Sequence, residues 1–249
     1  MNKIFVGTMG WGYDFWVGNL YPLNTPPGKY LNEYSKHFNT VEVDSTFYSI
    51  PHGEMVENWK EATPKEFIFS AKFPQSIIQD KMLSGAEEET RAFMKKISLL
   101  DTKLGPLVIQ LSYDFCMEDL HLLEKFLGML PKERRYVVEP RHKTLFDEKF
   151  YAFLRDRGVC LALVDHPFMP KIQTVTTDFT YIRLEGDRKK IKGITGKAEI
   201  DRSADLKLWS ERIRKFHEAS LDVYVYCSKF YSGHSPSDAR TLLNLLNID

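Results

Sequence analysis

Two carboxylates, Glu42 and Asp44, stand two residues apart at the end of the short apolar run 40–43. Side chains two apart in a strand point to the same face, so this spacing predicts an acid/base pair or two metal ligands. The other interpretation is a buried ion pair between one of them and Arg141 or Arg183. Burying an unpaired charge is costly, so Glu42, inside the run, must be paired, hydrogen-bonded or facing a wet cavity.

A second charged cluster, Glu139, Arg141 and His142, ends the run 136–139. Glu139 and Arg141 should share a face, whereas His142 begins the loop. A carboxylate beside an imidazole can move a proton or bind a divalent metal, and Asp165 would complete a ligand set with Glu139 and His142. No specific metal motif marks this set. The alternative is a salt bridge of Arg141 and a solvent-exposed His142.

Several basic or hydroxyl-bearing residues indicate an anion-binding site. Lys72 follows the run 67–71, where it would bind an anion, form a Schiff base or extend to the rim. We favour anion binding because no second lysine is placed to lower its pKa. Arg183 and the turn before Pro236 resemble the phosphate sites of barrel proteins, and this turn comprises Ser232, Gly233, His234 and Ser235. Ser235 is also expected to be the N-cap of the helix that follows.

Aromatic and amide side chains supply further ligand-binding candidates. Trp11, Tyr13 and Tyr48 follow the first two runs, where their rings would stack on a base or sugar, or else pack over the loops. Gln110 and Tyr226 lie within two later runs. The polar segment 186–203 is long enough to act as a lid.

Eight short apolar runs must position these residues. They are rich in β-branched and aromatic residues and nearly continuous, as in strands of a parallel sheet buried on both faces. They span residues 3–8, 40–43, 67–71, 106–111, 136–139, 160–164, 179–184 and 222–227. Helical patterns alternate with them, at 30–37, 55–61, 87–100, 118–130, 147–157, 204–219 and 236–246. Only the segment 165–178 lacks a helical pattern. Eight β-α repeats without a nucleotide-binding glycine motif predict a closed (β/α)₈ TIM barrel, with residues 1–249 as a single domain.

Composition narrows the class of function. The 34 basic residues balance 34 acidic ones, which argues mildly against a dedicated duplex-DNA binder. The cysteines Cys116, Cys160 and Cys227 are far apart and odd in number, so we expect free thiols and no thiol-rich zinc site. No signal peptide or membrane-spanning run is visible, and a cytoplasmic protein is the expectation.

Seven blocks of sequence make the chain resemble the DUF72 (YecE-like) family of barrel proteins. They are GTMGWGYDFW with LYP, VEVDSTFYSIP, FIFSAKFP, LGPLVIQLSYDF, VVEPRH, TYIRLEG and VYVYCSKFYSGHSPSDA. The resemblance implies the barrel and a polar cavity at the C-terminal ends of its strands. It also implies a layout similar to endonuclease IV and to sugar isomerases. The chain departs from the family pattern at Asp44, Glu185 and residues 227–229.

Together these features predict an enzyme, a hydrolase or an isomerase or lyase, that acts on an anionic small molecule such as a phosphorylated sugar or a nucleotide. Glu42, Glu139 and Asp165 would perform acid/base or metal chemistry, with Lys72 as a fourth catalytic candidate. The alternatives are a protein that binds or repairs nucleic acid and a ligand-binding barrel without catalysis. No membrane partner is expected.

Overall fold

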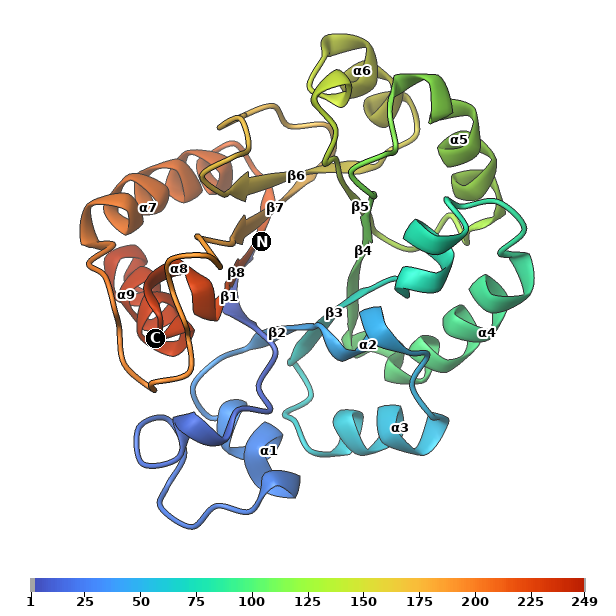
Figure 1. Cartoon of the computed structure of the whole chain (residues 1–249). Coiled ribbons are helices and arrows are strands. Elements are labelled where there is room, and N and C mark those ends of the chain that lie inside the picture. The colour runs from blue at the N-terminus through green and yellow to red at the C-terminus, as the bar shows by residue number, and fades with distance from the viewer. Residues whose placement is uncertain (1–2, 249) are drawn as a thin grey trace. The chain divides into compact units, whose positions relative to one another are not determined.

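The computed structural model describes residues 3–248, in which eight strands follow one another around a closed parallel barrel in the order β1 to β8 (Figure 1). All eight predicted strands are confirmed, with ends displaced by no more than two residues. They are β1 (Ile4–Met9), β2 (Thr40–Val43), β3 (Ile68–Lys72), β4 (Leu104–Gln110), β5 (Tyr136–Glu139), β6 (Cys160–Asp165), β7 (Phe179–Leu184) and β8 (Asp222–Cys227).

Helices separate most of these strands. The α-helices are α1 (Tyr30–Tyr34), α2 (Ser45–Tyr48), α3 (Gly53–Glu61), α4 (Glu87–Ile97), α5 (Leu120–Met129), α6 (Glu148–Asp156), α7 (Ser203–Glu218), α8 (Lys229–Ser232) and α9 (Ser235–Leu246). Short 3-10 or π segments are η1 (Asp14–Trp16), η2 (Pro27–Lys29), η3 (Ser76–Asp80), η4 (Ser98–Lys103), η5 (Met117–Asp119) and η6 (Lys143–Leu145). The segment between β6 and β7 contains no helix, as its sequence predicted.

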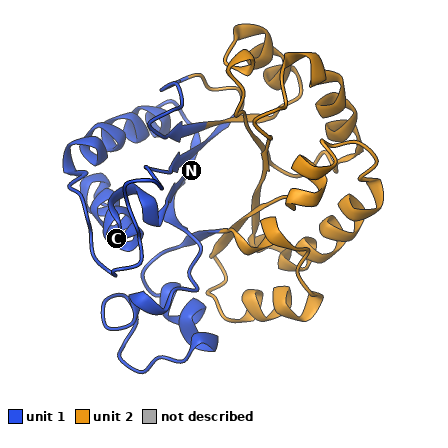
Figure 2. Ribbon diagram, in the orientation of Figure 1, with its two compact units in different colours: residues 1–42, 163–173, 178–249 blue, residues 43–162, 174–177 orange. Residues whose placement is uncertain are grey.

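The chain divides into two compact units, coloured separately in Figure 2. Unit 1 comprises residues 1–42, 163–173 and 178–249, and unit 2 comprises residues 43–162 and 174–177. In unit 1, β7 pairs with β8 so that Arg183 lies opposite Tyr226. In unit 2, β4 pairs with β5 so that Gln110 lies opposite Glu139.

Continuous burial explains why the strand sequences do not alternate between apolar and polar residues. Every residue of β2, β5, β6 and β7 is buried. Both faces of such strands are covered, which is the expected pattern for a parallel sheet between helices and a barrel interior. Charged residues in these strands are therefore removed from bulk water and need partners. None of the helices in residues 3–248 is long and apolar enough to cross a membrane.

Local helix signals agree with the sequence at α6 but not at α9. Asp147 accepts a hydrogen bond from Lys149 N and so caps α6, and Gly158 after it has a φ of 63°. The prediction that Ser235 is the N-cap of α9 is wrong. His234 occupies that position and Ser235 is the first helical residue. The hydroxyl of Ser235 is buried and has no hydrogen-bond partner among the described residues.

Candidate functional site

Four polar residues at the ends of β3, β4 and β5 form a continuous row in unit 2. Lys72 Nζ donates to Gln110 Oε1 at 3.1 Å, and Gln110 Nε2 donates to Glu139 Oε1 at 3.0 Å. Arg141 Nη2 forms an ion pair with the same Glu139 oxygen. We call Lys72, Gln110, Glu139 and Arg141 the strand-end row. It agrees with the alternative interpretation of this cluster, in which Arg141 forms a salt bridge.

The strand-end row leads from a buried interior to accessible side chains. Glu139 is fully buried, but the Arg141 side chain is 10% exposed and donates from Nη1 to the hydroxyl of Tyr113 at 3.1 Å. Tyr113 is 65% exposed. At the other end, Lys72 Nζ lies 3.9 Å from Asp44 Oδ1 and 4.1 Å from the centre of the Phe47 ring. Lys72 is thus a buried lysine and not a rim lysine.

Asp44 lies beyond the end of β2, as the residue before helix α2. Its φ of −80° and ψ of −26° are helical, so the two-residue alternation of the strand stops at Val43. The argument that Glu42 and Asp44 share a face therefore does not extend to Asp44. About a third of the Asp44 side chain is exposed, at 35%, whereas the carboxylate of Glu139 within the row is fully buried. Tyr48, at the end of α2, is largely exposed.

The metal candidates Glu139, His142 and Asp165 have other partners. Nδ1 of His142 lies 2.8 Å from Thr144 Oγ1, and the imidazole accepts from Thr144 N at the start of η6. Within residues 3–248 no group of three or more His, Cys, Asp or Glu side chains is placed to hold a metal ion. The structure thus does not bring the three candidates together as a metal site.

Glu42 belongs to a closed ion-pair network in unit 1. Arg183 donates to both of its oxygens, from Nη2 at 2.7 Å and from Nε at 3.0 Å, and Tyr181 donates its hydroxyl at 2.6 Å. Arg183 Nη1 lies 2.6 Å from Glu185 Oε1. Burial raises the pKa of Tyr181 well above its ordinary value. The interpretation of Glu42 as an ion-pair partner of Arg183 is confirmed, and Tyr181 was not anticipated.

Asp165, at the end of β6, is held by side chains from two later elements of unit 1. Its Oδ2 accepts from Trp209 Nε1 at 2.7 Å and from the Tyr231 hydroxyl at 3.0 Å. Its Oδ1 lies 3.6 Å from the ammonium of Lys171, an exposed residue. Burial raises the pKa of Tyr231 above its ordinary value. These contacts orient Asp165 and leave its other oxygen next to an exposed cation.

The remaining ring candidates occupy different environments in unit 1. Tyr226 is fully buried, and its hydroxyl is 2.8 Å from Thr40 Oγ1, which places it in the core. Tyr13 is half-buried beneath the ammonium of Lys229, 4.7 Å from its ring centre. Trp11 is half-buried, and its backbone carbonyl accepts from the Tyr21 hydroxyl. Tyr226 is thus inaccessible, whereas Trp11 and Tyr13 retain exposed surface.

The predicted phosphate turn is covered by the end of the segment 186–203. Glu199 N and Ile200 N both donate to the carbonyl of Ser232. Gly233 has a φ of 110°, and a Cβ there would lie 2.8 Å from Glu199 atoms, so only glycine fits. His234 Nδ1 lies 3.0 Å from Ser237 Oγ, and Ser232 donates its hydroxyl to Asp238. The anion-binding role of this turn remains a prediction.

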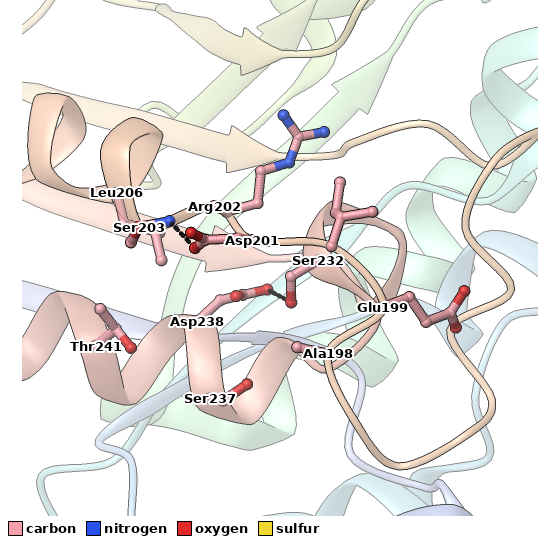
Figure 3. Close-up of a pocket in the computed structure, with 11 residues that line it drawn as sticks. Ala198, Glu199, Asp201, Arg202, Ser203, Leu206, Ser232, Ser237, Asp238 and Thr241 are labelled. Atoms are coloured by element: carbon pink, nitrogen blue, oxygen red, sulfur yellow. Dashed lines mark hydrogen bonds between the residues drawn. The ribbon is translucent and has the colours of Figure 1, made fainter.

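A pocket of about 400 Å³ lies beside this turn in unit 1 (Figure 3). Residues 198–202, the first residues of α7 and the first turns of α9 line it. Arg202 and Asp238 both line the pocket and were not among the residues predicted from the sequence. Asp238 looked like an ordinary acidic residue in the first turn of a helix, and only its burial distinguishes it.

Fold and strand-end side chains together define a (β/α)₈ barrel protein with charged groups at the carboxyl ends of its strands. The family model described as "Protein of unknown function DUF72" matches residues 5–249. The chain therefore belongs to the DUF72 family.

Relatives and solved structures agree with this membership. UPF0759 protein YecE of Escherichia coli K12 is 32% identical to this chain over the matched region. That region covers 65% of this chain and 59% of the length of YecE. UPF0759 protein YunF of Bacillus subtilis is 26% identical over 99% of the chain and 95% of its own length. A DUF72 family protein of Thermotoga maritima has a TM-score of 0.84 at 25% identity, covering 99% of this chain and all of that one. A methyltransferase from Methanosarcina mazei, at 10% identity and a TM-score of 0.51 over 98% of this chain and 94% of its own, shares the fold alone.

Proposed function

We propose that the protein is an enzyme that acts on an anionic small molecule, such as a sugar phosphate or a nucleotide, at the strand-end row. The observation that carries this proposal is the row itself. It connects two cationic side chains to one buried carboxylate, Glu139: Arg141 contacts it directly, and Lys72 is linked to it through Gln110. Lys72 and Arg141 are side chains of the kind that bind the phosphate or carboxylate group of a ligand.

The two cations at the ends of the row would bind an anion in different ways. Lys72 has a compact ammonium that binds an anion as a point charge, and Arg141 has a planar guanidinium that suits bidentate contact. Both are mostly buried, so their attraction for an anion is weakly screened by solvent. Glu139 and Gln110 hold the two cations in place.

Asp44 is the best-placed proton carrier for the reaction. Its carboxylate is partly exposed and lies 3.9 Å from the Lys72 ammonium. Glu42 was an equal candidate from sequence, but its oxygens are already taken up by Arg183 and Tyr181. We assign Asp44 the role of general base and Glu42 a structural role.

Exposed rings beside the row suit the rest of the substrate. Tyr113 is linked to Arg141 by its hydroxyl, has the Arg141 guanidinium 5.6 Å from its ring centre, and is 65% exposed. Phe47 and Tyr48 pack edge to face at the other end. Rings such as these stack on a nucleobase or on the apolar face of a sugar.

Calorimetric titration with inorganic pyrophosphate tests the anion site. Wild-type protein should bind this probe, and Lys72→Met should weaken binding at least about tenfold because a mostly buried charge contact is lost. Lys171→Met is the matched control, since Lys171 is exposed and belongs to unit 1. An equal loss of pyrophosphate affinity in Lys72→Met and Lys171→Met would contradict the proposal.

A second titration separates the alternatives. Nucleic-acid binding depends on many phosphate contacts, so the affinity for a single-stranded oligonucleotide would fall steeply with salt. For catalysis, sugar phosphates and nucleotides are incubated with the protein and followed by phosphorus NMR. Conversion by wild type that is lost in Asp44→Asn, while pyrophosphate still binds, supports an enzyme. Binding without conversion of any compound supports a ligand-binding barrel.

A further inference from the structure

The pocket of Figure 3 is separate from the strand-end row and belongs entirely to unit 1. At about 400 Å³ it has the size of a small-molecule site. Polar side chains dominate its lining. Hydroxyl groups come from α7, α8 and α9, namely Ser203, Ser232, Ser237 and Thr241. The lining also includes three carboxylates and one guanidinium.

Two of these charged groups, the guanidinium of Arg202 and the carboxylate of Glu199, already form hydrogen bonds with other groups. Arg202 donates from Nε to Tyr231 O at 3.0 Å and pairs from Nη1 with Asp205, and Figure 3 shows it directed away from Asp238. Glu199 accepts from the backbone N–H groups of Lys192 and Gly193, at 3.0 and 2.8 Å. The charged groups left to meet a ligand are therefore both acidic.

Those two groups are Asp201 and Asp238. Asp201 accepts from Ser203 N at 2.8 Å, before α7, and is exposed. Asp238 is only 4% exposed, and its Oδ2 accepts from the Ser232 hydroxyl at 2.7 Å. An acidic residue in the first turn of a helix is already stabilised by the helix dipole. That contribution does not compensate for burial here, because desolvation raises the pKa of Asp238 to about 7.

Other charged and titratable groups around Asp238 are few. Arg202 from the covering segment lowers its pKa, and the Ser232 hydroxyl on α8 does the same. Behind it, the buried Cys227 thiol of β8 is kept neutral by burial and by the negative charge of Asp238. His234, just before α9, has a pKa lowered by burial and by Arg240. Glu199 and Asp201 add negative charge from the pocket lining. A positively charged ligand would offset the negative charge of these carboxylates.

We propose that this pocket binds a small hydroxylated organic amine, with its ammonium group between Asp201 and Asp238 and its hydroxyl groups on Ser203 and Thr241. An ammonium offers three donors, which suits carboxylate and hydroxyl acceptors. It also favours the ionised form of Asp238, so binding near neutral pH releases a proton from that carboxyl group. This ligand class is opposite in charge to the substrate proposed for the strand-end row, and the proposal does not depend on that function.

Titration calorimetry with glucamine, and with sorbitol as its uncharged analogue, tests the proposal. Wild-type protein should bind glucamine and not sorbitol at pH 8. Affinity should fall about tenfold at pH 6, because Asp238, with a pKa of about 7, changes from mostly ionised to mostly neutral. Near pH 7, two buffers of different ionisation enthalpy should reveal proton release on binding.

Matched variants locate the site. Asp238→Asn keeps the shape and an acceptor for Ser232, and it should weaken glucamine binding at least about tenfold at pH 8. Asp205→Asn removes the same charge from a residue that pairs with Arg202 outside the pocket lining, and it should leave affinity within about twofold. Thermal unfolding checks that both fold. Asp201→Asn supplies a second pocket variant.

Three results would overturn the proposal. The first is absence of glucamine binding at millimolar concentration. The second is equal binding of sorbitol and glucamine, which would make the ammonium irrelevant. The third is unchanged glucamine affinity in folded Asp238→Asn and Asp201→Asn.

Discussion

Two groups of strand-borne charges in this molecule look alike in sequence and differ in the structure. The pair of Glu42 and Arg183 in unit 1 is sealed, with side-chain exposures of 0–1%, and Glu185 beyond it, at 2%, also lies 3.3 Å from the exposed Arg188. The strand-end row in unit 2 also contains a fully buried carboxylate, Glu139, but its members and neighbours become steadily more exposed, up to Tyr113 at 65%.

The comparison shows that an embedded charge alone does not mark a functional site. A sealed ion pair has its charges and donors satisfied by the protein, and breaking it leaves a buried charge. A row that reaches water can exchange one of its partners for a ligand. The exposure of the charged side chains themselves therefore separates the two groups: 10% for Arg141 and 35% for Asp44 beside the row, against 0–1% for Glu42 and Arg183.

The largest expected effect concerns the sealed network. Arg183→Met should lower the free energy of unfolding by about 3–5 kcal/mol, because Glu42 loses its cation in a dry interior, whereas Glu185 still pairs with the exposed Arg188. Urea denaturation of wild type and variant measures the difference. A loss below about 1 kcal/mol would mean that the network is not sealed.

A smaller effect of opposite sign is expected at Asp238, a buried carboxyl without a dedicated ion-pair partner among the described residues. Its pKa is about 7 when folded against 3.8 ordinarily, so the unfolded chain releases this proton first. This group therefore stabilises the fold fully below about pH 4, and that contribution is lost as pH rises to about 7. At pH 8, Asp238→Asn should be more stable than wild type by about 1–3 kcal/mol, and at pH 4 the two should be similar. Urea denaturation at both pH values checks this. An equal difference in stability between Asp238→Asn and wild type at pH 4 and pH 8 would contradict the burial of Asp238 as the cause of the stabilisation.

The smallest expected effect is at Lys72, in the strand-end row. Lys72→Met should change the free energy of unfolding by no more than about 1 kcal/mol, because Asp44 is partly hydrated and Glu139 keeps Arg141. The matched control is Lys103→Met, an equally buried lysine that donates to Lys60 O, Thr63 O and Thr63 Oγ1. That variant should cost about 1–3 kcal/mol, since carbonyls are left unsatisfied. If Lys72→Met is the more destabilising of the two in urea, the row is part of the sealed core.

The strands could be predicted because parallel strands that are buried on both faces appear in a sequence as short continuous apolar runs. The run 136–139 shows this pattern and is too short to form a buried helix of ordinary length. The pairing of Glu139 with Arg141 also followed, because residues two apart in a strand share a face. The partner of Glu42 could only be narrowed to two arginines. Its choice of Arg183, 141 positions away, depends on the barrel bringing β2 and β7 into one network.

Other features left no sequence signal. The pKa of Asp238 is set by burial, and nothing in SPSDAR distinguishes it from an exposed first-turn acid. The N-cap of α9 was misplaced because Ser-Pro is the usual start of a helix, whereas Gly233 and the covering segment shift the start here by one residue. Tertiary contact overrode a local preference at that point.

Amide NMR mapping of pyrophosphate binding tests the central claim most directly. The account predicts that the shifts gather at Lys72, Gln110 and Arg141 in unit 2, and that Lys72→Met abolishes them while leaving the rest of the spectrum intact. Shifts that gather instead at residues 232–235 in unit 1, and that persist in Lys72→Met, would contradict the assignment of the strand-end row as the anion site.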